Sequence, residues 1–210
     1  MILDLHNHSI KSDDGRARVE SYCQWIRKKE LPLDGFVLTE HRQFDADSDY
    51  GALEDEFGLR ILKGSEVETE YGHVLVFGVN EDLLRAFDFT RIDLPLETVV
   101  SESRRCGAVA VPCHPGRPKV GLCAHWHTLG AVDGVHTIET LNGGSREGEN
   151  EQASEYAETH GWKRIGGSDS HIVSHIGRCA TKFENDFEGI EGLVNELRGD
   201  RYDAIRSAAD

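Results

Sequence analysis

The first eight residues combine the signal of a buried strand with two side chains that commonly bind metals. Ile2, Leu3 and Leu5 form a short apolar run, which is typical of a strand inside a fold. The run ends in His6 and His8, whose imidazoles point to one side because side chains alternate faces along a strand. Such a pair is half of a metal site, but histidine pairs also occur on solvated strand ends. The motif alone leaves both interpretations open.

Apolar runs of the same kind recur along the chain and alternate with helical segments. We expect further strands at 35–39, 60–68, 72–79, 107–112, 135–141, 164–167 and 179–183, and helices at 19–29, 52–57, 94–106, 147–160 and 190–198. This alternation predicts an α/β fold with a mainly parallel sheet, in which the runs at 60–68 and 72–79 form a hairpin. About seven such strands close most naturally as a barrel related to the eightfold kind. An open doubly wound sheet is the alternative, although no G-x-G-x-x-G motif follows the first strand.

Length, cysteine content and charge narrow the class of protein. The 210 residues suffice for one domain, 1–210, and no apolar window is long enough to span a membrane. The N-terminus lacks the features of a signal peptide, and five irregularly spaced cysteines favour a reducing cytoplasm over a disulfide framework. The net charge of −15, from 38 acidic and 23 basic residues, disfavours a long nucleic-acid duplex as partner. We therefore expect a cytoplasmic protein without a membrane partner.

Titratable side chains gather where the expected strands end, which is where barrel enzymes place their active sites. Nine such residues are His6, His8, Asp13, His41, Glu66, His73, His114, Asp169 and His171. Each has an ordinary explanation when taken singly; Asp13, for example, could cap the following helix. Gathering several carboxylates and neutral imidazoles without a cation, however, would leave buried polar groups poorly paired. The set therefore predicts a metal centre.

The same residues fall into motifs that resemble the PHP (polymerase and histidinol phosphatase) family of metal-dependent phosphoesterases. The matching motifs, in chain order, are Asp4-Leu5-His6-Asn7-His8-Ser9 with Ser12-Asp13, Thr39-Glu40-His41, Gly64-Ser65-Glu66, Gly72-His73, His114-Pro115, Glu139-Thr140-Leu141-Asn142 and Gly166-Gly167-Ser168-Asp169-Ser170-His171. The match covers essentially the whole chain. The combined set is specific, although no single motif is.

The resemblance implies a distorted seven-stranded (β/α) barrel that holds two or three divalent ions at the C-terminal ends of its strands. One ion would be held by His6, His8, Glu66 and Asp169, a second by Glu66, His73 and His114, and a third by Asp13, His41 and His171. Two positions depart from the family pattern. Glu40 stands where the family has Asp, which leaves its supporting role open, and Asp14 could replace Asp13 as the ligand.

Imidazole-rich sites bridged by carboxylates favour Zn, Mn or Fe over Mg or Ca, and the sequence does not choose among the three. Because no serine or cysteine is paired with a dedicated base, we expect a metal-bridging hydroxide as the nucleophile. A pocket histidine such as His171, or a bound water, would protonate the leaving group. Arg117 is the first candidate for a phosphate clamp, and Arg42 and Arg178 are weaker ones. Gly143-Gly144-Ser145 could bind an anion through backbone N–H groups, but more often such a segment simply starts a helix.

The sequence thus predicts a metal-dependent hydrolase of phosphate esters, acting on a small phosphomonoester, a nucleotide or a short oligonucleotide. An amidohydrolase-like metal hydrolase is the alternative enzyme; it typically needs a bridging lysine, for which Lys63 is the candidate. A metal-binding module without activity is the non-enzyme alternative. The segment Cys123-Ala124-His125-Trp126-His127 resembles a further metal cluster, but a structural or lid role fits its irregular surroundings better.

Overall fold

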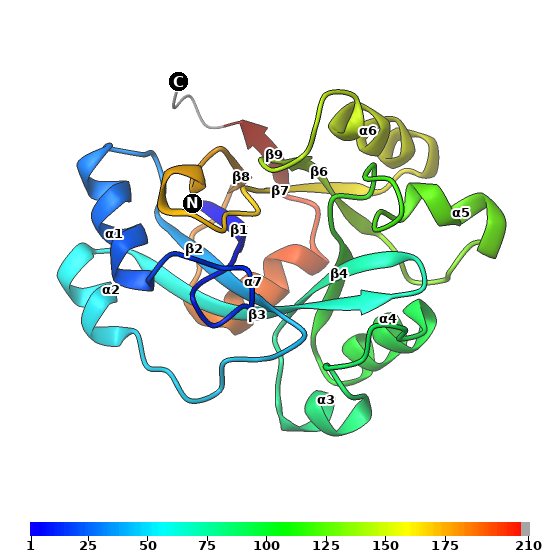
Figure 1. Cartoon of the computed structure of the whole chain (residues 1–210), viewed down its shortest axis with the longest axis horizontal. Helices are drawn as coiled ribbons and strands as arrows, with labels where there is room; N and C mark the ends of the chain where they lie inside the picture. Colours follow the sequence, from blue (N-terminus) through cyan, green and yellow to red (C-terminus); the bar gives the residue numbers. More distant parts are fainter. Residues whose placement is uncertain (207–210) are drawn as a thin grey trace.

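The computed structural model describes residues 1–206 (Figure 1). Its strands are β1 Ile2–Asn7, β2 Gly35–His41, β3 Arg60–Thr69, β4 Gly72–Phe77, β5 Val109–Pro112, β6 Thr137–Asn142, β7 Lys163–Gly167, β8 Cys179–Phe183 and β9 Tyr202–Arg206. Its helices are α1 Val19–Lys28, α2 Gly51–Phe57, α3 Glu81–Ala86, α4 Leu96–Arg105, α5 Cys123–Leu129, α6 Glu149–His160 and α7 Gly189–Arg198, with a short 3-10 helix at Val173–His175. None of the helices in residues 1–206 has the length and hydrophobicity of a membrane-spanning segment.

Seven strands form one curled sheet in the order β5-β4-β3-β2-β1-β8-β9, and β6 and β7 form a second sheet. β1, β2 and β3 are parallel neighbours, as are β6 and β7. The pairings of β3 with β4, β4 with β5, β1 with β8 and β8 with β9 are antiparallel. The α/β class and the hairpin of β3 and β4 agree with the prediction, but the expectation of a mainly parallel sheet is wrong. A tight turn joins β3 to β4, and only antiparallel strands can be joined so closely.

The two sheets curl toward each other at the ends of β1 and β5. Asn7 forms a parallel bridge with Ser170 just beyond β7, and the backbone N–H of His8 donates to the Ser170 carbonyl (2.8 Å). On the other side, the backbone N–H of His114 after β5 donates to the Glu139 carboxylate on β6 (2.8 Å). These contacts complete a distorted barrel whose strand ends surround one cup. The cup is lined by His6, His8, His41, Glu66, His73, Cys113, His114, Asp169 and His171.

An extra residue in β1 decides which side chains face the barrel interior. Leu3 and Leu5 point inward and pack in the interior core. Strict alternation would then send His6 and His8 outward. The pairing of β1 with β2 shifts register between Asp4 and Asn7, where β1 contains one residue more than β2. Such a bulge re-aims the following side chains, so the two histidines face the same interior as the leucines.

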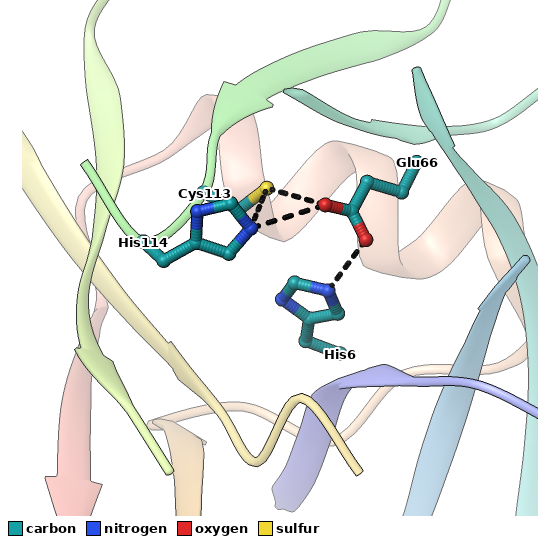
Figure 2. Close-up of side chains that lie close together, drawn as sticks. All are labelled: His6, Glu66, Cys113 and His114. Atoms are coloured by element: carbon teal, nitrogen blue, oxygen red, sulfur yellow. Dashed lines mark hydrogen bonds and ion pairs between the residues drawn. The ribbon is translucent and has the colours of Figure 1, made fainter. Parts of the chain in front are cut away.

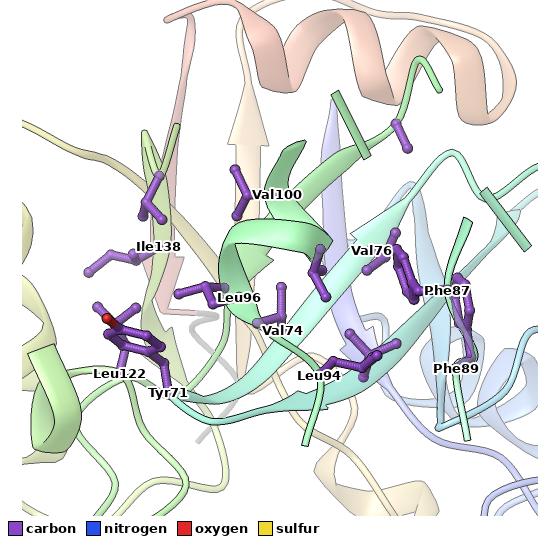
Figure 3. Packing of buried hydrophobic residues seen from close by; sticks show 14 of the residues in the cluster. Tyr71, Val74, Val76, Phe87, Phe89, Leu94, Leu96, Val100, Leu122 and Ile138 are labelled. Carbon is purple, nitrogen blue, oxygen red and sulfur yellow. The ribbon is translucent and has the colours of Figure 1, made fainter. Parts of the chain in front are cut away.

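Three apolar clusters hold this framework together. The interior cluster includes Leu3, Leu5, Val37, Phe77 and Ile165 from the strands and Leu193, Val194 and Leu197 from α7, which closes the end of the barrel opposite the cup. A second cluster packs α1 against the outer faces of β2 and β3. The third packs α4 over β4 and includes Leu96, Val100, Val74 and Val76 (Figure 3). Figure 1 shows α1 and α2 beside β2 and β3, with α5 and α6 at the opposite side of the molecule.

Besides the short 3-10 helix, three elements of the described residues were not expected from the sequence. α3 is a short helix capped by Asn80, whose side chain accepts a hydrogen bond from the Leu83 N–H (3.0 Å). α5 covers the segment expected to be irregular. β9 adds an antiparallel edge strand to β8. Segments this short carry too few periodic positions to give a clear sequence signal.

Candidate metal centre

The cup lies at the ends of the strands, and three residues there have an unusual backbone conformation. His114, Asp169 and Arg42, which follow β5, β7 and β2, all have positive φ angles of 32°, 52° and 53°. Residues other than glycine adopt this region at an energetic cost, and such positions cluster at functional sites. Here the left-handed turns direct the chain away from the strands while His114 and Asp169 stay at the cup.

One oxygen of the Glu66 carboxylate faces three histidines. Glu66 Oε2 lies 2.9 Å from His6 Nε2, 3.1 Å from His8 Nε2 and 3.3 Å from His41 Nδ1. His6 Nε2 and His8 Nε2 are themselves only 3.1 Å apart. Glu66, His6 and His8 are completely buried. His6 and His8 therefore meet this oxygen away from water, and the partly exposed His41 approaches the same oxygen.

The other oxygen of Glu66 faces a second group of side chains. Glu66 Oε1 lies 2.7 Å from His73 Nδ1 and 3.1 Å from His114 Nε2. The Cys113 thiol lies 3.4 Å from the same oxygen (Figure 2). Glu66 thus stands between two sets of ligand-type atoms, as a bridging carboxylate does in a binuclear site.

Asp169 supplies the second carboxylate of the cup. Its Oδ1 lies 3.4 Å from His6 Nε2 and 3.3 Å from His8 Nε2. Its Oδ2 accepts a hydrogen bond from Arg117 Nη2 (2.6 Å), and the same nitrogen donates to Asn142 Oδ1 (2.8 Å). Arg117 therefore orients Asp169 at the edge of the cup.

The side chains of Asp13 and Asp14, in the loop after β1, contact different residues. The Asp13 carboxylate points away and accepts a hydrogen bond from Arg42 (2.7 Å). Asp14 Oδ2 lies 3.0 Å from His171 Nε2 and 3.5 Å from His41 Nε2. The structure therefore does not bring Asp13 to the cup, and Asp14 is the carboxylate beside His41 and His171. Local spacing could not distinguish them, because the direction of the loop depends on its contact with Arg42.

Hydrogen bonds outside the cup assign the tautomers of the first two histidines. His6 Nδ1 lies 3.0 Å from Glu139 Oε1, so this nitrogen carries the proton and donates to the carboxylate. His8 Nδ1 lies 3.3 Å from the Ser12 hydroxyl, which donates in turn to Glu40 (2.6 Å). In both imidazoles, Nε2 is therefore the nitrogen directed at the cup. Imidazoles that bind metals are oriented by partners of this type.

The open question about Glu40 is answered by the same contacts. Glu40 is fully buried and accepts hydrogen bonds from the backbone N–H and the hydroxyl of Ser9 (3.1 and 2.6 Å) as well as from Ser12. It therefore fixes the loop that follows β1. Through Ser12 it also orients His8, although it does not reach the cup itself.

The charges of the cup depend strongly on one another. Burial by itself would raise the pKa of Glu66, but His6, His114 and His73 outweigh it and hold that pKa well below its usual range. Burial would lower the pKa of His8, yet hydrogen bonds to Asp169 and Glu66 raise it to about 9. The carboxylates therefore favour positive charge among the imidazoles, which protons or metal cations can supply.

Four overlapping groups of side chains have ligand atoms close enough to share a cation. They are His6, His8, Glu66 and Asp169; His6, Glu66, Cys113 and His114; His41, Glu66 and His73; and His8, His41 and His171. The first is the set that the family resemblance implies for one ion. Because these groups combine imidazole nitrogens with carboxylate oxygens, their chemistry fits Zn, Mn or Fe.

Sequence reasoning did not identify two functional side chains, one behind the cup and one in it. Glu139 is fully buried and orients His6, and Cys113 points into the cup beside His114. Cys113 directly precedes His114 at the end of β5, and the recurrence of reactive groups at strand ends could have indicated it. Gly167 also contributes, since a Cβ there would lie 2.4 Å from the His6 Cβ, so only glycine lets β7 pass this close to β1.

Other residues considered from the sequence lie outside the cup. Lys63 Nζ donates to the Ser48 carbonyl (2.8 Å), so it does not reach Glu66. His125 lies on α5, with its Nε2 2.7 Å from the Lys119 carbonyl. Arg178 lies within 3.4 Å of the Gly143 carbonyl, beside the cup.

Parts of this chain are similar in sequence to known proteins. A sequence model of the PHP-associated region matches residues 147–202. The chain is 24% identical over 128 residues to uncharacterized protein MJ1587 of Methanocaldococcus jannaschii, which covers 56% of this chain and 70% of that protein. The predicted resemblance to the PHP family is thereby confirmed.

Several solved structures share the fold over nearly the whole chain. PsfC from Pseudomonas syringae has a TM-score of 0.72 at 21% identity, over 99% of this chain and 91% of that one. A two-domain Bacteroides vulgatus protein that contains a predicted PHP-like metal-dependent phosphoesterase has a TM-score of 0.67 at 20% identity, over 99% and 65%. At these identities the likeness establishes the fold.

Two further solved structures share this fold. Endonuclease Q, in complex with a 27-mer duplex that has an abasic lesion at the active site, has a TM-score of 0.67 at 17% identity, over 95% of this chain and 57% of that one. An amidohydrolase from Chromobacterium violaceum, with bound SO4 and no metal, has a TM-score of 0.63 at 18% identity, over 97% of both chains. The fold therefore gives no support to the expectation that a long duplex is excluded.

Proposed function

We propose that this chain is a metal-dependent hydrolase that cleaves phosphate esters. The observation that carries the proposal is the convergence of imidazole nitrogens on both oxygens of the buried Glu66 carboxylate. A buried cluster of this kind has no structural use without cations, because apolar side chains would fill the same space at lower cost. The likeness to PHP-like phosphoesterases supports the same reaction class.

The residues of the cup divide the binding of cations between them. His6, His8, Glu66 and Asp169 would hold one ion, and Glu66 with His73 and His114 a second. A third would lie among His41, His171 and Asp14, beside His8. When bound, Zn, Mn or Fe ions there would polarise a phosphoryl group and activate water for attack.

Arg117 and His171 are the residues that we assign to the substrate. Arg117 Nη2 donates to Asp169 and Asn142, and its Nε lies 4.0 Å from Glu149 Oε2, so Nη1 is the nitrogen that we assign to a phosphoryl oxygen at the edge of the cup. His171 stands at the mouth of the cup, where its Nδ1 is held 3.0 Å from the Asp169 carbonyl. With Nδ1 donating to that carbonyl, Nε2 is the nitrogen that would deliver a proton to a departing alcohol, and it can do so only when it does not bind the third ion.

The amidohydrolase-like alternative rests on the fold shared with the Chromobacterium violaceum enzyme. It is disfavoured by Lys63, which lies outside the cup and supplies no bridging lysine. Small phosphomonoesters, nucleotides and short oligonucleotides are the substrates that we propose first. A duplex with a flipped or frayed nucleotide remains a substrate to be tested, given the fold shared with Endonuclease Q.

The proposal is tested by metal analysis and activity measured on the same preparations. We expect the purified protein to contain at least two equivalents of Zn, Mn or Fe, and to cleave p-nitrophenyl phosphate or a member of a nucleotide panel. Chelation should abolish cleavage, and added metal should restore it. Cyclic amides and lactones form the matched panel for the amidohydrolase alternative.

Two glutamates on one strand provide a variant and its control. Glu66→Gln removes the charge shared by the cup, whereas Glu68→Gln changes a residue that accepts a hydrogen bond from Arg42 (2.6 Å) outside it. We expect at least about tenfold weaker metal binding for Glu66→Gln and none of this loss for Glu68→Gln. Cleavage that survives Glu66→Gln, or a metal-loaded protein inert toward every phosphate ester, would contradict the proposal.

A further inference from the structure

The Cys113 thiol belongs to the cup and has no part in the function proposed so far. Cys113 follows β5 and is completely buried. Its Sγ lies 3.4 Å from Glu66 Oε1 and 3.5 Å from His114 Nε2 (Figure 2). With the 3.1 Å separation of Glu66 Oε1 from His114 Nε2, these three atoms form a nearly equilateral triangle.

The dimensions of this triangle match one face of a tetrahedral zinc site. Zn–S bonds measure about 2.3 Å, and Zn–N and Zn–O bonds about 2.0–2.2 Å. At tetrahedral angles, these lengths place neighbouring ligand atoms about 3.3–3.6 Å apart. A cation could therefore lie against Cys113, Glu66 and His114 with only small movements of the side chains. His6 lies beside these three residues, and one ligand atom from each of the four lies within 4.8 Å of the others.

We propose that Cys113 is a thiolate ligand of the cation held by Glu66 and His114, so that this cation site contains nitrogen, oxygen and sulfur. The inference rests on the proposed function, since it requires a metal in the cup. Soft thiolate ligands select Zn, Fe or Co over the harder Mn. Within residues 1–206, no other cysteine joins a group of potential metal ligands, so a sulfur signal from the metal can be assigned to one residue.

X-ray absorption of the zinc-loaded protein tests the proposal directly. We expect a Zn–S shell at about 2.3 Å in the unaltered protein. Substitution with Co²⁺ should give a thiolate-to-cobalt charge-transfer band in the near ultraviolet. Both signals should be lost in Cys113→Ser and kept in Cys123→Ser, a matched control in which another buried cysteine, on α5, is changed. Zinc affinity should fall roughly tenfold or more in Cys113→Ser, with a smaller change for Mn.

The outcomes separate this proposal from the one on which it rests. Zinc bound with nitrogen and oxygen neighbours but no sulfur shell would overturn the role of Cys113 and leave the metal centre standing; the thiol would then only donate a hydrogen bond to Glu66. A protein that binds no metal at all would overturn both. The spectra of the unaltered protein decide the question even if Cys113→Ser fails to fold.

Discussion

Glu66 and the residues around it illustrate how buried charges are arranged in this molecule. Both carboxylate oxygens face imidazole nitrogens, and Asp169 adds a second negative charge near His6 and His8. Each of these groups alone would be costly to bury. Together they form a site in which the negative charges of the carboxylates are balanced when positive charge lies among the imidazoles.

This arrangement predicts that the metal-free protein loses stability as the pH rises. The pKa of His8 is raised to about 9 from an ordinary value of 6.5, so its contribution is fully present below about pH 6.5 and is lost as the pH rises through about 9. We expect the free energy of unfolding in chelator, measured by urea titration, to fall by on the order of a few kcal/mol over that range. His8→Gln should flatten this dependence, and His160→Gln on α6 should not. Equal slopes for all three proteins would count against the assignment.

Arg117 gives a second prediction at the scale of single residues. Arg117→Lys keeps a positive charge beside Asp169 but loses the guanidinium, which can bond Asp169 through one nitrogen and a phosphoryl group through another. We expect KM for a phosphomonoester to rise about tenfold, with metal content unchanged and kcat altered less. Arg178→Lys, beside the cup, is the matched control and should change KM little. A fall in metal content instead would show that Arg117 acts mainly by positioning Asp169.

At the scale of elements, β1 and α7 have complementary tasks. The bulge in β1 turns His6 and His8 toward the interior, while α7 closes the other end of the barrel with Leu193, Val194 and Leu197. The cup is therefore built on β1, whose earlier residues Leu3 and Leu5 are embedded in an apolar core. This arrangement keeps the ligands rigid without placing charge in that core.

The closing role of α7 predicts unequal effects for two alanine substitutions in one helix. Leu193 is completely buried in the interior core, whereas Asn195 is exposed. We expect Leu193→Ala to lower the free energy of unfolding by about 2–5 kcal/mol, because it leaves a cavity at the barrel end. Asn195→Ala should change it by less than about 0.5 kcal/mol. Urea unfolding measures both, and a loss below about 1 kcal/mol for Leu193→Ala would contradict the role given to α7.

At the scale of the whole molecule, the cup joins segments that are far apart in the sequence. Ligand-type side chains come from β1, β2, β3, β4 and the residues after β5 and β7. A bound cation would therefore cross-link most of the barrel. The net charge of −15 adds a general repulsion between acidic residues that a cation would relieve locally.

This cross-linking predicts a large thermal shift on metal binding. At a free metal concentration of about 100 times Kd, we expect Tm to rise by about 5–10 °C for a chain of this length. Differential scanning fluorimetry with and without chelator measures the shift. Glu68→Gln should show the full shift and Glu66→Gln little of it. A metal-independent Tm would indicate that the ions do not bind the cup.

Local rules were sufficient to predict much of this arrangement from the sequence. Apolar runs located most strands, and the polar residues at their ends indicated which side chains would gather. His6, His8, Glu66 and Asp169 lie together in the structure because the ends of β1, β3 and β7 open on the same side of the barrel. Strand polarity and side-chain alternation are properties of neighbouring residues, so a sequence pattern expresses them.

Tertiary contacts decided the rest. The register shift that turns His6 inward depends on how β1 pairs with β2, and the choice of Asp14 over Asp13 depends on the contact with Arg42. The place of Cys113 beside Glu66 depends on the packing of β5 against β4. Each of these features joins segments separated by many residues, and local spacing carries no information on such pairings. The sequence therefore determined which chemistry the chain contains, and the folded barrel determined which atoms meet.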